Sequence, residues 1–308
     1  MHKIVFFNHY HRGDLHTSKE FVRQLQNELP DVTFEYWHNN PPKLLDDLHI
    51  STTGTPNHLN QKEPFYLDED EGILYINTWV ACQWDIFCKH GGINMLTFYE
   101  TWGNILETVN STFNTEIKLY EDMREYLPRM NYDILNTANI DNFIEKEAKD
   151  KKRVLICNNV PQSSQSFPST MREFINPLAE ENPDIIFICT NEIPTYGNNN
   201  IYFTKNIIGD TSGCDLQEVS YLSKFCDVIV GKNSGPYVFC ETYENLMDEN
   251  KKFISFNTKH PEYSEVRESM YWGLDLNCKY TAVPILDIQS LLEEDIENIK
   301  KVLAENIL

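Results

Sequence analysis

The chain has 308 residues, enough for two domains of roughly 150 residues each, and its 26 Lys and Arg against 47 Asp and Glu give a net charge of −21. A protein that binds nucleic acid or an anionic membrane through charge needs clustered basic side chains, so this balance argues against both partners. Hydrophobic residues make up 41% of the sequence and charged residues 24%, which is typical of globular proteins and excludes large-scale disorder.

The sequence contains no pattern for export or membrane insertion. No stretch approaches the roughly 18 apolar residues of a membrane span, and the apolar run near the N-terminus is too short for a signal peptide. The eight cysteines form no C-x-x-C pair, and several lie within apolar runs typical of strands. We therefore expect reduced, buried thiols in a cytoplasmic protein without a transmembrane segment.

Short apolar runs alternate with helical patterns, which is typical of an α/β protein with mainly parallel sheets. In the first half, the patterns predict strands at residues 3–7, 32–37 and 73–76, and helices at residues 17–29, 94–110 and 115–126. The polar segment 8–16 is predicted as a loop between the first strand and the first helix.

The second half begins a new strand–loop–helix pattern. It predicts strands at residues 154–157, 185–189, 227–230 and 252–256, helices at residues 170–181 and 215–225, and an amphipathic terminal helix at residues 288–303. The charged stretch 145–153 is the predicted linker. We expect two Rossmann-like domains, 1–148 and 149–308, facing an interdomain cleft where such folds bind ligands, with the N-terminal domain as one surface for the last helix.

The most informative motif lies in residues 209–236. Its pattern is a helix, a short apolar strand, and a tight turn, Asn233-Ser234-Gly235-Pro236, that opens another helix. Small residues let backbone N–H groups approach an anion, and the positive end of the new helix dipole favours it. The turn therefore suits a diphosphate, with Ser234 adding a hydroxyl donor and Lys232 adding charge.

This stretch resembles the nucleotide-binding motif of the ADP-heptose transferases, glycosyltransferase family 9. The matching residues are Glu218, Leu222, Asp227, Gly231, Ser234, Gly235 and Pro236. Gly13-Asp14, after the first strand, is similar to a Gly-Asp loop of the same family. The resemblance implies an α/β GT-B fold, with an acceptor-binding N-terminal domain and a C-terminal domain that binds a nucleotide sugar.

Three positions depart from the family pattern. Asn233 stands where the family has Asp, Val238 replaces a His that follows the Pro, and Glu20 stands where a Pro is expected. We therefore do not expect heptose specifically as the donor sugar.

The resemblance implies that Asp14 is the general base. Inverting glycosyl transfer needs a carboxylate that removes the acceptor hydroxyl proton. The alternative for Asp14 is a loop aspartate stabilised near a helix N-terminus. The loop also holds His11, Arg12, Gly13 and His16, which we expect to bind the diphosphate or orient Asp14; a solvated polar loop is the alternative.

Further donor contacts are expected in the second domain. Ser163 and Ser164 follow the strand at residues 154–157 and offer hydroxyls to phosphate or sugar, unless their loop is an ordinary connection. Glu218 suits a hydrogen bond to a ribose, unless it merely faces solvent. The spacing of Glu241 and Glu249 matches retaining GT-B enzymes, but we expect both on one helix, outside that role.

Two other groups favour structural interpretations. Asp68 and Asp70 have the D-x-D spacing of metal-dependent glycosyltransferases, but a solvated acidic turn is favoured. Aromatic side chains in the first domain suit sugar stacking or core packing, with packing favoured. They are Trp79, Trp84, Tyr99 and Trp102.

The sequence therefore predicts an inverting glycosyltransferase of polysaccharide biosynthesis that needs no metal and no cofactor besides its co-substrate. It would move a hexosyl or heptosyl group from a nucleotide sugar to a glycan or glycolipid. Two alternatives stay open: a non-hydrolysing nucleotide-sugar epimerase, which turns over donor alone, and a catalytically silent protein that binds a glycan or nucleotide.

Overall fold

The chain folds into two compact units in the computed structural model. The structure describes residues 1–8, 12–54, 56, 59, 64–78, 98–159, 171–211, 214–232, 235–258, 285–290 and 296–307. The described residues up to Arg129 form the first unit, and those from Met130 onward form the second. The predicted division into an acceptor-binding domain, 1–148, and a domain that binds a nucleotide sugar, 149–308, stays a prediction.

The first unit holds a five-stranded sheet in the order β3-β2-β1-β5-β4, in which β4 is the antiparallel edge strand. The strands are β1 (Lys3–Asn8), β2 (Thr33–His38), β3 (Ser51–Thr53), β4 (Phe65–Asp68) and β5 (Ile73–Asn77). The helices are α1 (Arg12–Glu28) and α3 (Phe98–Phe113), with the 3₁₀ helices η1 (Pro42–Leu48) and η2 (Met123–Tyr126).

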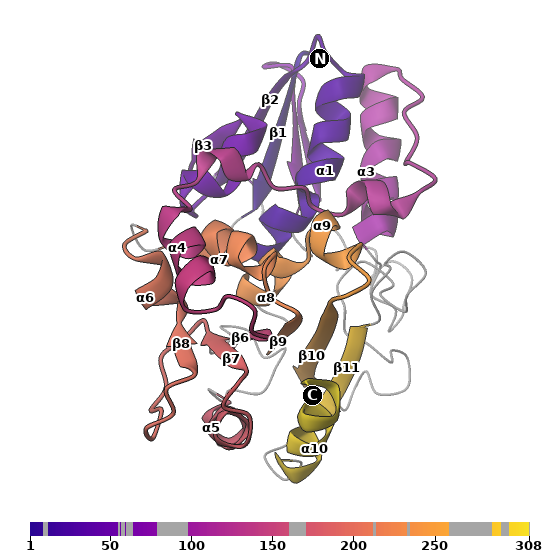
Figure 1. The fold of residues 1–308 in the computed structure, drawn as a ribbon. Coiled ribbons are helices and arrows are strands. Elements are labelled where there is room, and N and C mark those ends of the chain that lie inside the picture. The colour runs from indigo at the N-terminus through magenta and orange to yellow at the C-terminus, as the bar shows by residue number, and fades with distance from the viewer. Residues whose placement is uncertain are drawn as a thin grey trace. The chain divides into compact units, whose positions relative to one another are not determined.

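Helices α1 and α3 lie side by side along the first sheet (Figure 1). Phe21 of α1 stacks on Trp102 of α3 with ring centroids 5.4 Å apart, and Tyr126 of η2 lies 4.8 Å from the same indole ring. All three side chains are buried. Burying each large side chain contributes roughly 1.5–3 kcal/mol, so this cluster holds the helical layer together. Trp102 is thus a core residue, and its predicted alternative as a sugar-stacking surface is wrong.

Two local predictions in the first unit were wrong. Helix α1 begins at Arg12, so the second part of the predicted loop is helical and Asp14 lies in the first turn, where the helix dipole favours an acid. The helix predicted at residues 115–126 is absent as an α-helix: residues 115–122 are irregular, and only the short 3₁₀ helix η2 follows. Asn110 prevents it, because its side chain accepts from the Ile117 N–H and donates to the Ile117 carbonyl, turning the chain after α3.

The second unit contains a six-stranded parallel sheet in the order β11-β10-β9-β6-β7-β8. Its strands are β6 (Arg153–Cys157), β7 (Ile186–Cys189), β8 (Ile201–Phe203), β9 (Val228–Lys232), β10 (Lys252–Thr258) and β11 (Ile285–Ser290). Its helices are η3 (Tyr132–Ile134), α4 (Ala138–Lys146), α5 (Arg172–Glu181), α6 (Thr204–Ile208), α7 (Leu216–Ser223), α8 (Gly235–Cys240), α9 (Tyr243–Leu246) and α10 (Ile296–Ile307).

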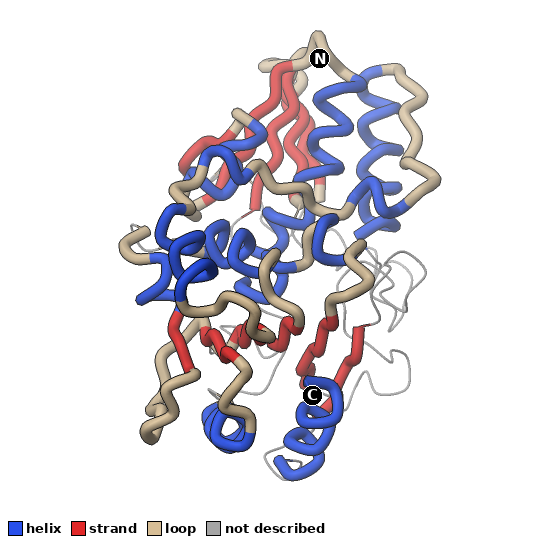
Figure 2. Tube along the Cα trace, viewed as in Figure 1, coloured by secondary structure: helices blue, strands red, loops and turns tan. Residues whose placement is uncertain are grey.

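Helices cover both faces of the second sheet, as the layers in Figure 2 show. Val154 and Ile156 of β6 enter a buried cluster with residues of α5 and α10. Cys157 alternates to the opposite face, toward Gly231 and Tyr237 of α8. Strands buried on both faces read as continuous apolar runs, which explains why they were predictable. The α/β class with two Rossmann-like units is confirmed.

The terminal helix differs from its prediction. Residues 288–290 belong to β11, and α10 begins at Ile296. Leu303 and Ile307 of α10 pack in the core of the second unit against α5. The second unit itself therefore supplies the surface that the apolar face of α10 needs. None of the helices in the described part of the chain is long and apolar enough to cross a membrane.

A buried lysine closes the end of α7. The Lys251 ammonium donates to the carbonyl oxygens of Ser223, Lys224 and Cys226 at 3.1, 2.7 and 2.8 Å. Carbonyls at a helix C-terminus have no partner within the helix, and a cation there also interacts favourably with the dipole. Lys251 therefore fixes α7 at the end opposite to the one predicted to bind a ligand.

Substituting Gly231 by Ala should destabilise the second unit. An added Cβ would lie 2.6 Å from Tyr237 Cδ2 and 2.7 Å from Cys157 Cβ, so strand and helix must separate. We expect a loss of about 1–3 kcal/mol in the free energy of unfolding, measured by urea denaturation. Gly103→Ala is the control: its Cβ meets Leu119 at 3.7 Å, and alanine stabilises a helix interior by up to about 1 kcal/mol. Equal stability of Gly231→Ala and the native protein would contradict the packing argument.

Candidate active site

Asp14 lies where the strand order of the first sheet reverses. The chain leaves β1 toward β2 on one side, while β5 pairs with β1 on the other, with Phe7 opposite both Trp37 and Asn77. Ligands of open α/β sheets bind outside the carboxyl ends of strands at this switch point. Asp14, in the first turn of the helix that follows β1, is therefore at the position where a ligand of this unit is expected.

Burial changes the acidity of Asp14. Its Oδ2 is buried and accepts no hydrogen bond from the described residues. Loss of solvation raises the pKa of the carboxyl from 3.8 to about 7, with the Asn8 side chain opposing the rise. A carboxylate with a pKa near neutral is suited to general-base catalysis, because it is both ionised and basic at the working pH.

A buried chain of hydroxyls supports the helix turn that carries Asp14. Ser18 lies one turn after Asp14, and its Oγ is 2.9 Å from the Tyr36 hydroxyl of β2. The Tyr36 hydroxyl also contacts Thr78 Oγ1, and Thr78 donates from its backbone N–H to the Phe7 carbonyl of β1 at 3.1 Å. These bonds join α1 to β2, to the end of β5 and to β1, so the position of Asp14 is fixed by buried polar contacts.

Buried ion pairs hold the next turn of α1. Lys19 Nζ lies 2.9 Å from Asp47 Oδ1 of η1, and both side chains are almost fully buried. Arg23 lies 3.2 Å from the same aspartate and 3.4 Å from Glu20. Removing one member of a buried pair leaves an uncompensated charge, so these contacts constrain α1 strongly.

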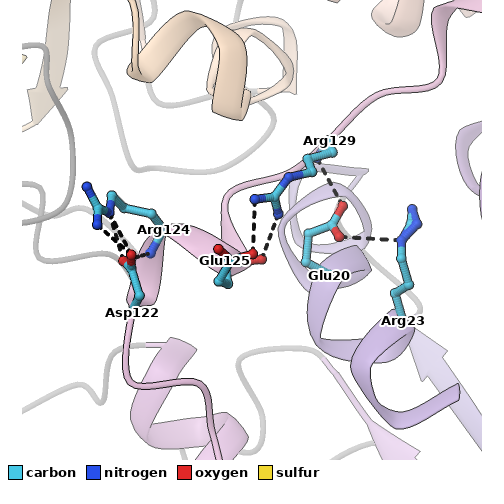
Figure 3. A network of polar contacts seen from close by, with 6 residues as sticks. All are labelled: Glu20, Arg23, Asp122, Arg124, Glu125 and Arg129. Atoms are coloured by element: carbon cyan, nitrogen blue, oxygen red, sulfur yellow. Dashed lines mark hydrogen bonds and ion pairs between the residues drawn. The ribbon is translucent and has the colours of Figure 1, made fainter. Parts of the chain in front are cut away.

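Figure 3 shows Glu20 between Arg23 and Arg129. Its Oε1 accepts the backbone N–H of Arg129 at 3.0 Å, which ties α1 to the segment after η2. Burial raises the pKa of Glu20, while the positive charge of Arg23 and the Arg129 N–H lower it. Glu20 is the residue that stands where the resembled family has Pro. In this chain its carboxylate binds a backbone donor that Pro could not, a role the sequence reasoning did not assign.

The other residues of the predicted anion loop have different environments. His11 lies outside the described residues. Arg12 is exposed, and its Nε donates to Asn40 Oδ1 at 3.3 Å. The carbonyl of Gly13 accepts from Thr17 Oγ1 at 3.0 Å. His16 is fully buried, and burial followed by the charge of Lys19 lowers its pKa well below the usual value. A contact of His16 with a diphosphate would therefore involve a neutral imidazole.

The second sheet reverses its strand order between β6 and β9, which pair with Cys157 opposite Gly231. The predicted donor residues follow these two strands. Ser163 and Ser164 come after β6 and lie outside the described residues, as do Asn233 and Ser234 after β9. The start of the β6 loop is held by Asn158, which accepts from the Asn191 N–H at 2.8 Å and donates to its carbonyl at 3.0 Å.

The structure brings the other residues that were predicted to bind the nucleotide sugar to one edge of the second sheet. Lys232 is the last residue of β9, and Gly235 and Pro236 open α8. A Cβ on Gly235 would lie 3.7 Å from Leu216, so the first turns of α7 and α8 are adjacent. Glu218 is in that turn of α7 and is mostly buried, which excludes the interpretation that it merely faces solvent. Two helix N-termini thus converge beside the end of β9, where an anion is favoured.

The structure also bears on the predicted acidic turn, the paired glutamates, the tryptophans and metal binding. The Glu71 N–H donates to Asp68 Oδ1 at 3.0 Å, so Asp68 caps the acidic turn between β4 and β5. Glu241 follows the end of α8 and Glu249 follows α9, so the expectation of one common helix was wrong. Trp79 and Trp84 lie outside the described residues. Among the described residues, no group of three His, Cys, Asp or Glu side chains is arranged to hold a metal ion.

Solved structures match nearly the whole chain, whereas no protein-family model and no curated protein matches its sequence significantly. A glycosyl transferase family 9 protein from Veillonella parvula has a TM-score of 0.50 and 12% identity, over 99% of this chain and 89% of that one. E. coli heptosyltransferase WaaC with ADP-2-deoxy-2-fluoro heptose has a TM-score of 0.50 and 8% identity, over 99% of both chains. The structure of WaaC with ADP has a TM-score of 0.50 and 10% identity, again over 99% of both.

At these identities the likeness concerns the fold. The chain has the fold class of GT-B glycosyltransferases, built from two Rossmann-like α/β units. The resemblance to glycosyltransferase family 9, found in two short motifs, is thereby confirmed at the level of architecture. Function has to be argued from the site.

Asp14→Asn should make the protein more stable above neutral pH. The buried carboxyl binds its proton more tightly in the folded than in the unfolded chain, so its contribution to stability is fully present below pH 3.8 and is lost as the pH rises through about 7. Asparagine removes this loss, so the variant should gain up to about 4 kcal/mol at pH 8, at about 1.4 kcal/mol per pKa unit, and little at pH 4.

Chemical denaturation across this pH range measures the difference. Asp31→Asn, which removes one exposed charge from the same unit, controls for the change in net charge. A gain for Asp14→Asn that did not grow with pH would contradict the assignment of a buried carboxyl with a raised pKa.

Proposed function

We propose that this protein is an inverting glycosyltransferase that moves a sugar from a nucleotide-sugar donor to a hydroxyl of a glycan or glycolipid. The observation that carries the proposal is Asp14, a half-buried residue with a buried Oδ2 and a pKa raised to about 7, at the switch point of the first sheet. The fold shared with family 9 glycosyltransferases supports it.

The donor is proposed to bind the second unit. Its diphosphate would lie against Asn233, Ser234 and Gly235, where the first turns of α7 and α8 meet. Glu218 would accept a hydrogen bond from the ribose, and Ser163 and Ser164 would contact phosphate or sugar. The adjacent helix N-termini support this assignment, because a nucleoside diphosphate brings negative charge to their positive ends. WaaC, a structural neighbour, has been solved with ADP.

The reaction balances with the chain's own residues. Asp14 accepts the proton of the acceptor hydroxyl as that oxygen forms a bond to the anomeric carbon. The bond from the anomeric carbon to the diphosphate oxygen breaks on the opposite face, which inverts the configuration. The nucleoside diphosphate leaves with the bonding electrons. Backbone donors, helix dipoles and Lys232 stabilise its charge, which is why we propose that no metal is required.

The proposal also covers location and partners. The described cysteines, Cys157, Cys189, Cys214, Cys226 and Cys240, are buried and form no disulfide. Persistent thiols are typical of a reducing compartment, which supports a cytoplasmic location. The sugar transferred is hexosyl or heptosyl, and the acceptor belongs to polysaccharide or glycolipid synthesis.

A donor screen followed by a transfer assay tests the function. A nucleotide sugar that binds only the native state raises the apparent melting temperature, so a thermal-shift panel selects donors. The selected donor is then incubated with glycan and glycolipid acceptors, with and without EDTA. Release of nucleotide that depends on acceptor and resists EDTA is expected. Conversion of donor without acceptor would identify an epimerase, and binding without turnover would identify a silent protein.

The activity should depend on Asp14 and on pH. Below neutral pH, kcat/KM should rise about tenfold per pH unit and level off above about 7, because only the ionised carboxylate accepts a proton. Asp14→Asn should abolish transfer and leave nucleotide affinity within a few-fold of the native value. Asp31→Asn should keep both. An active Asp14→Asn protein would refute the base assignment.

Glu218→Gln should weaken nucleotide binding. A hydrogen bond from a ribose hydroxyl to a carboxylate is stronger than one to an amide, so we expect about a tenfold rise in Kd for the nucleotide, measured by calorimetry. Glu244→Gln, at an exposed position in the first turn of α9, is the matched control. An unchanged Kd for Glu218→Gln would remove this residue from the donor site.

A further inference from the structure

A dense group of cations stands out in this acidic chain. Five of its 26 basic residues fall within the eight positions 146–153. They are Lys146, Lys149, Lys151, Lys152 and Arg153, and all five line one cavity of about 810 Å³ in the second unit. This volume is in the range of small-molecule sites, and the cavity is open to solvent, so a ligand has direct access to the lysines.

The base of the cavity is held by paired strand ends. Arg153 begins β6, and Asp227 directly precedes β9. The Arg153 N–H donates to Asp227 Oδ2 at 2.7 Å, the Asp227 N–H donates to the Arg153 carbonyl at 2.9 Å, and the guanidinium Nε lies 3.9 Å from Oδ2. Arg153 and Asp227 therefore offset each other and provide a fixed base for the lysines.

A tight turn carries the lysines around this base. Asp150 has a left-handed backbone, with φ of 57°, and reverses the chain between Lys149 and Lys151. The turn is anchored by the fully buried Ala148, whose carbonyl accepts the Lys151 N–H at 3.3 Å. Against Glu145 and Asp150, the remaining lining charges, the four lysines leave a positive excess.

This cavity is distinct from the predicted donor site. It lies at the amino ends of β6 and β9, whereas the donor residues follow the carboxyl ends of the same strands. At about 3.3 Å per residue, the five-residue strand β6 separates the two edges by about 13 Å. One anion of diphosphate size cannot span both.

We propose that this cavity binds a phosphate-bearing anion. Several ammonium groups that line one cavity attract an anion, and an anion with several oxygens accepts charge-assisted hydrogen bonds from more than one of them. The chemistry is the same whether the phosphate is soluble or displayed by a lipid headgroup. The inference stands apart from the proposed transfer reaction, because none of its residues is assigned to donor or acceptor.

Two probes separate the sources, with the full chain in both arms. Calorimetry with inorganic tripolyphosphate at low salt tests a soluble anion, and co-sedimentation with phosphatidylglycerol vesicles, compared with phosphatidylcholine vesicles, tests a headgroup. The variant is Lys146→Gln/Lys149→Gln/Lys151→Gln, three exposed lysines of the cavity. The control is Lys205→Gln/Lys300→Gln/Lys301→Gln, which removes equal charge from the same unit.

We expect the native protein and the control to bind in at least one arm, and the cavity variant to lose at least tenfold in affinity there. For tripolyphosphate, occupancy of the donor site would persist in the variant, so the expected result is one binding site fewer. Binding by the native protein in neither arm, or equal losses in the two triple variants, would overturn the proposal.

Discussion

The candidate chemistry of this protein depends on where its two sheets reverse their strand order. From β6 the chain proceeds toward β7, and from β9 it proceeds toward β10 on the other side, so the loops that leave these neighbouring strands diverge. Divergence leaves the carboxyl edge open between them. In the first unit, β1 has β2 on one side and β5 on the other. In the second unit, Gly231 lets α8 pack closely against β9, because Tyr237 of α8 fills the space that a side chain on Gly231 would occupy.

At Asp14, the property that suits the proposed general base also lowers the stability of the folded protein. A carboxylate kept from water without a full set of donors costs free energy, and that same deprivation makes it basic. The surrounding contacts offset this cost by holding α1 in place: the Ser18–Tyr36–Thr78 chain and the Lys19–Asp47 pair bind the helix beyond its first turn. The helix is thereby fixed while its first turn keeps a carboxylate with a raised pKa, the arrangement that a functional site would need.

The sequence predicted most of the strands because buried parallel strands are continuous apolar runs, as in β6, β7 and β10. It failed where a single polar side chain decides the path. Asn110 turns the chain after α3 by bonding to Ile117, which no periodicity reveals. At residues 288–290, the amphipathic pattern was mistaken for a helix although pairing with β10 makes them a strand. Tertiary pairing outweighs local pattern there.

The site was predictable to the extent that it rests on loops after strands. Gly13-Asp14 and Gly235-Pro236 lie in the first turns of the helices that follow β1 and β9, because chain order determines which segment follows which strand, although Gly13-Asp14 was expected in a loop. The raised pKa of Asp14 was not predictable, since it arises from loss of solvation in the folded protein, which no local sequence pattern reveals. The role of Glu20 was missed for the same reason: its partner Arg129 is more than a hundred positions away. Long-range partners leave no local signal.

The distribution of cations explains how an acidic chain can handle anions. Lys19 and Arg23 form ion pairs with Asp47, and Lys251 donates to three carbonyls, so these charges stabilise the fold and do not bind ligands. The diphosphate proposed to bind at the end of β9 would then be held by backbone N–H groups and helix dipoles, which attract anions regardless of net charge. At the opposite edge of the same sheet, by contrast, four lysines line a single cavity: Lys146, Lys149, Lys151 and Lys152. Their concentration is most simply understood as a second place for negative charge.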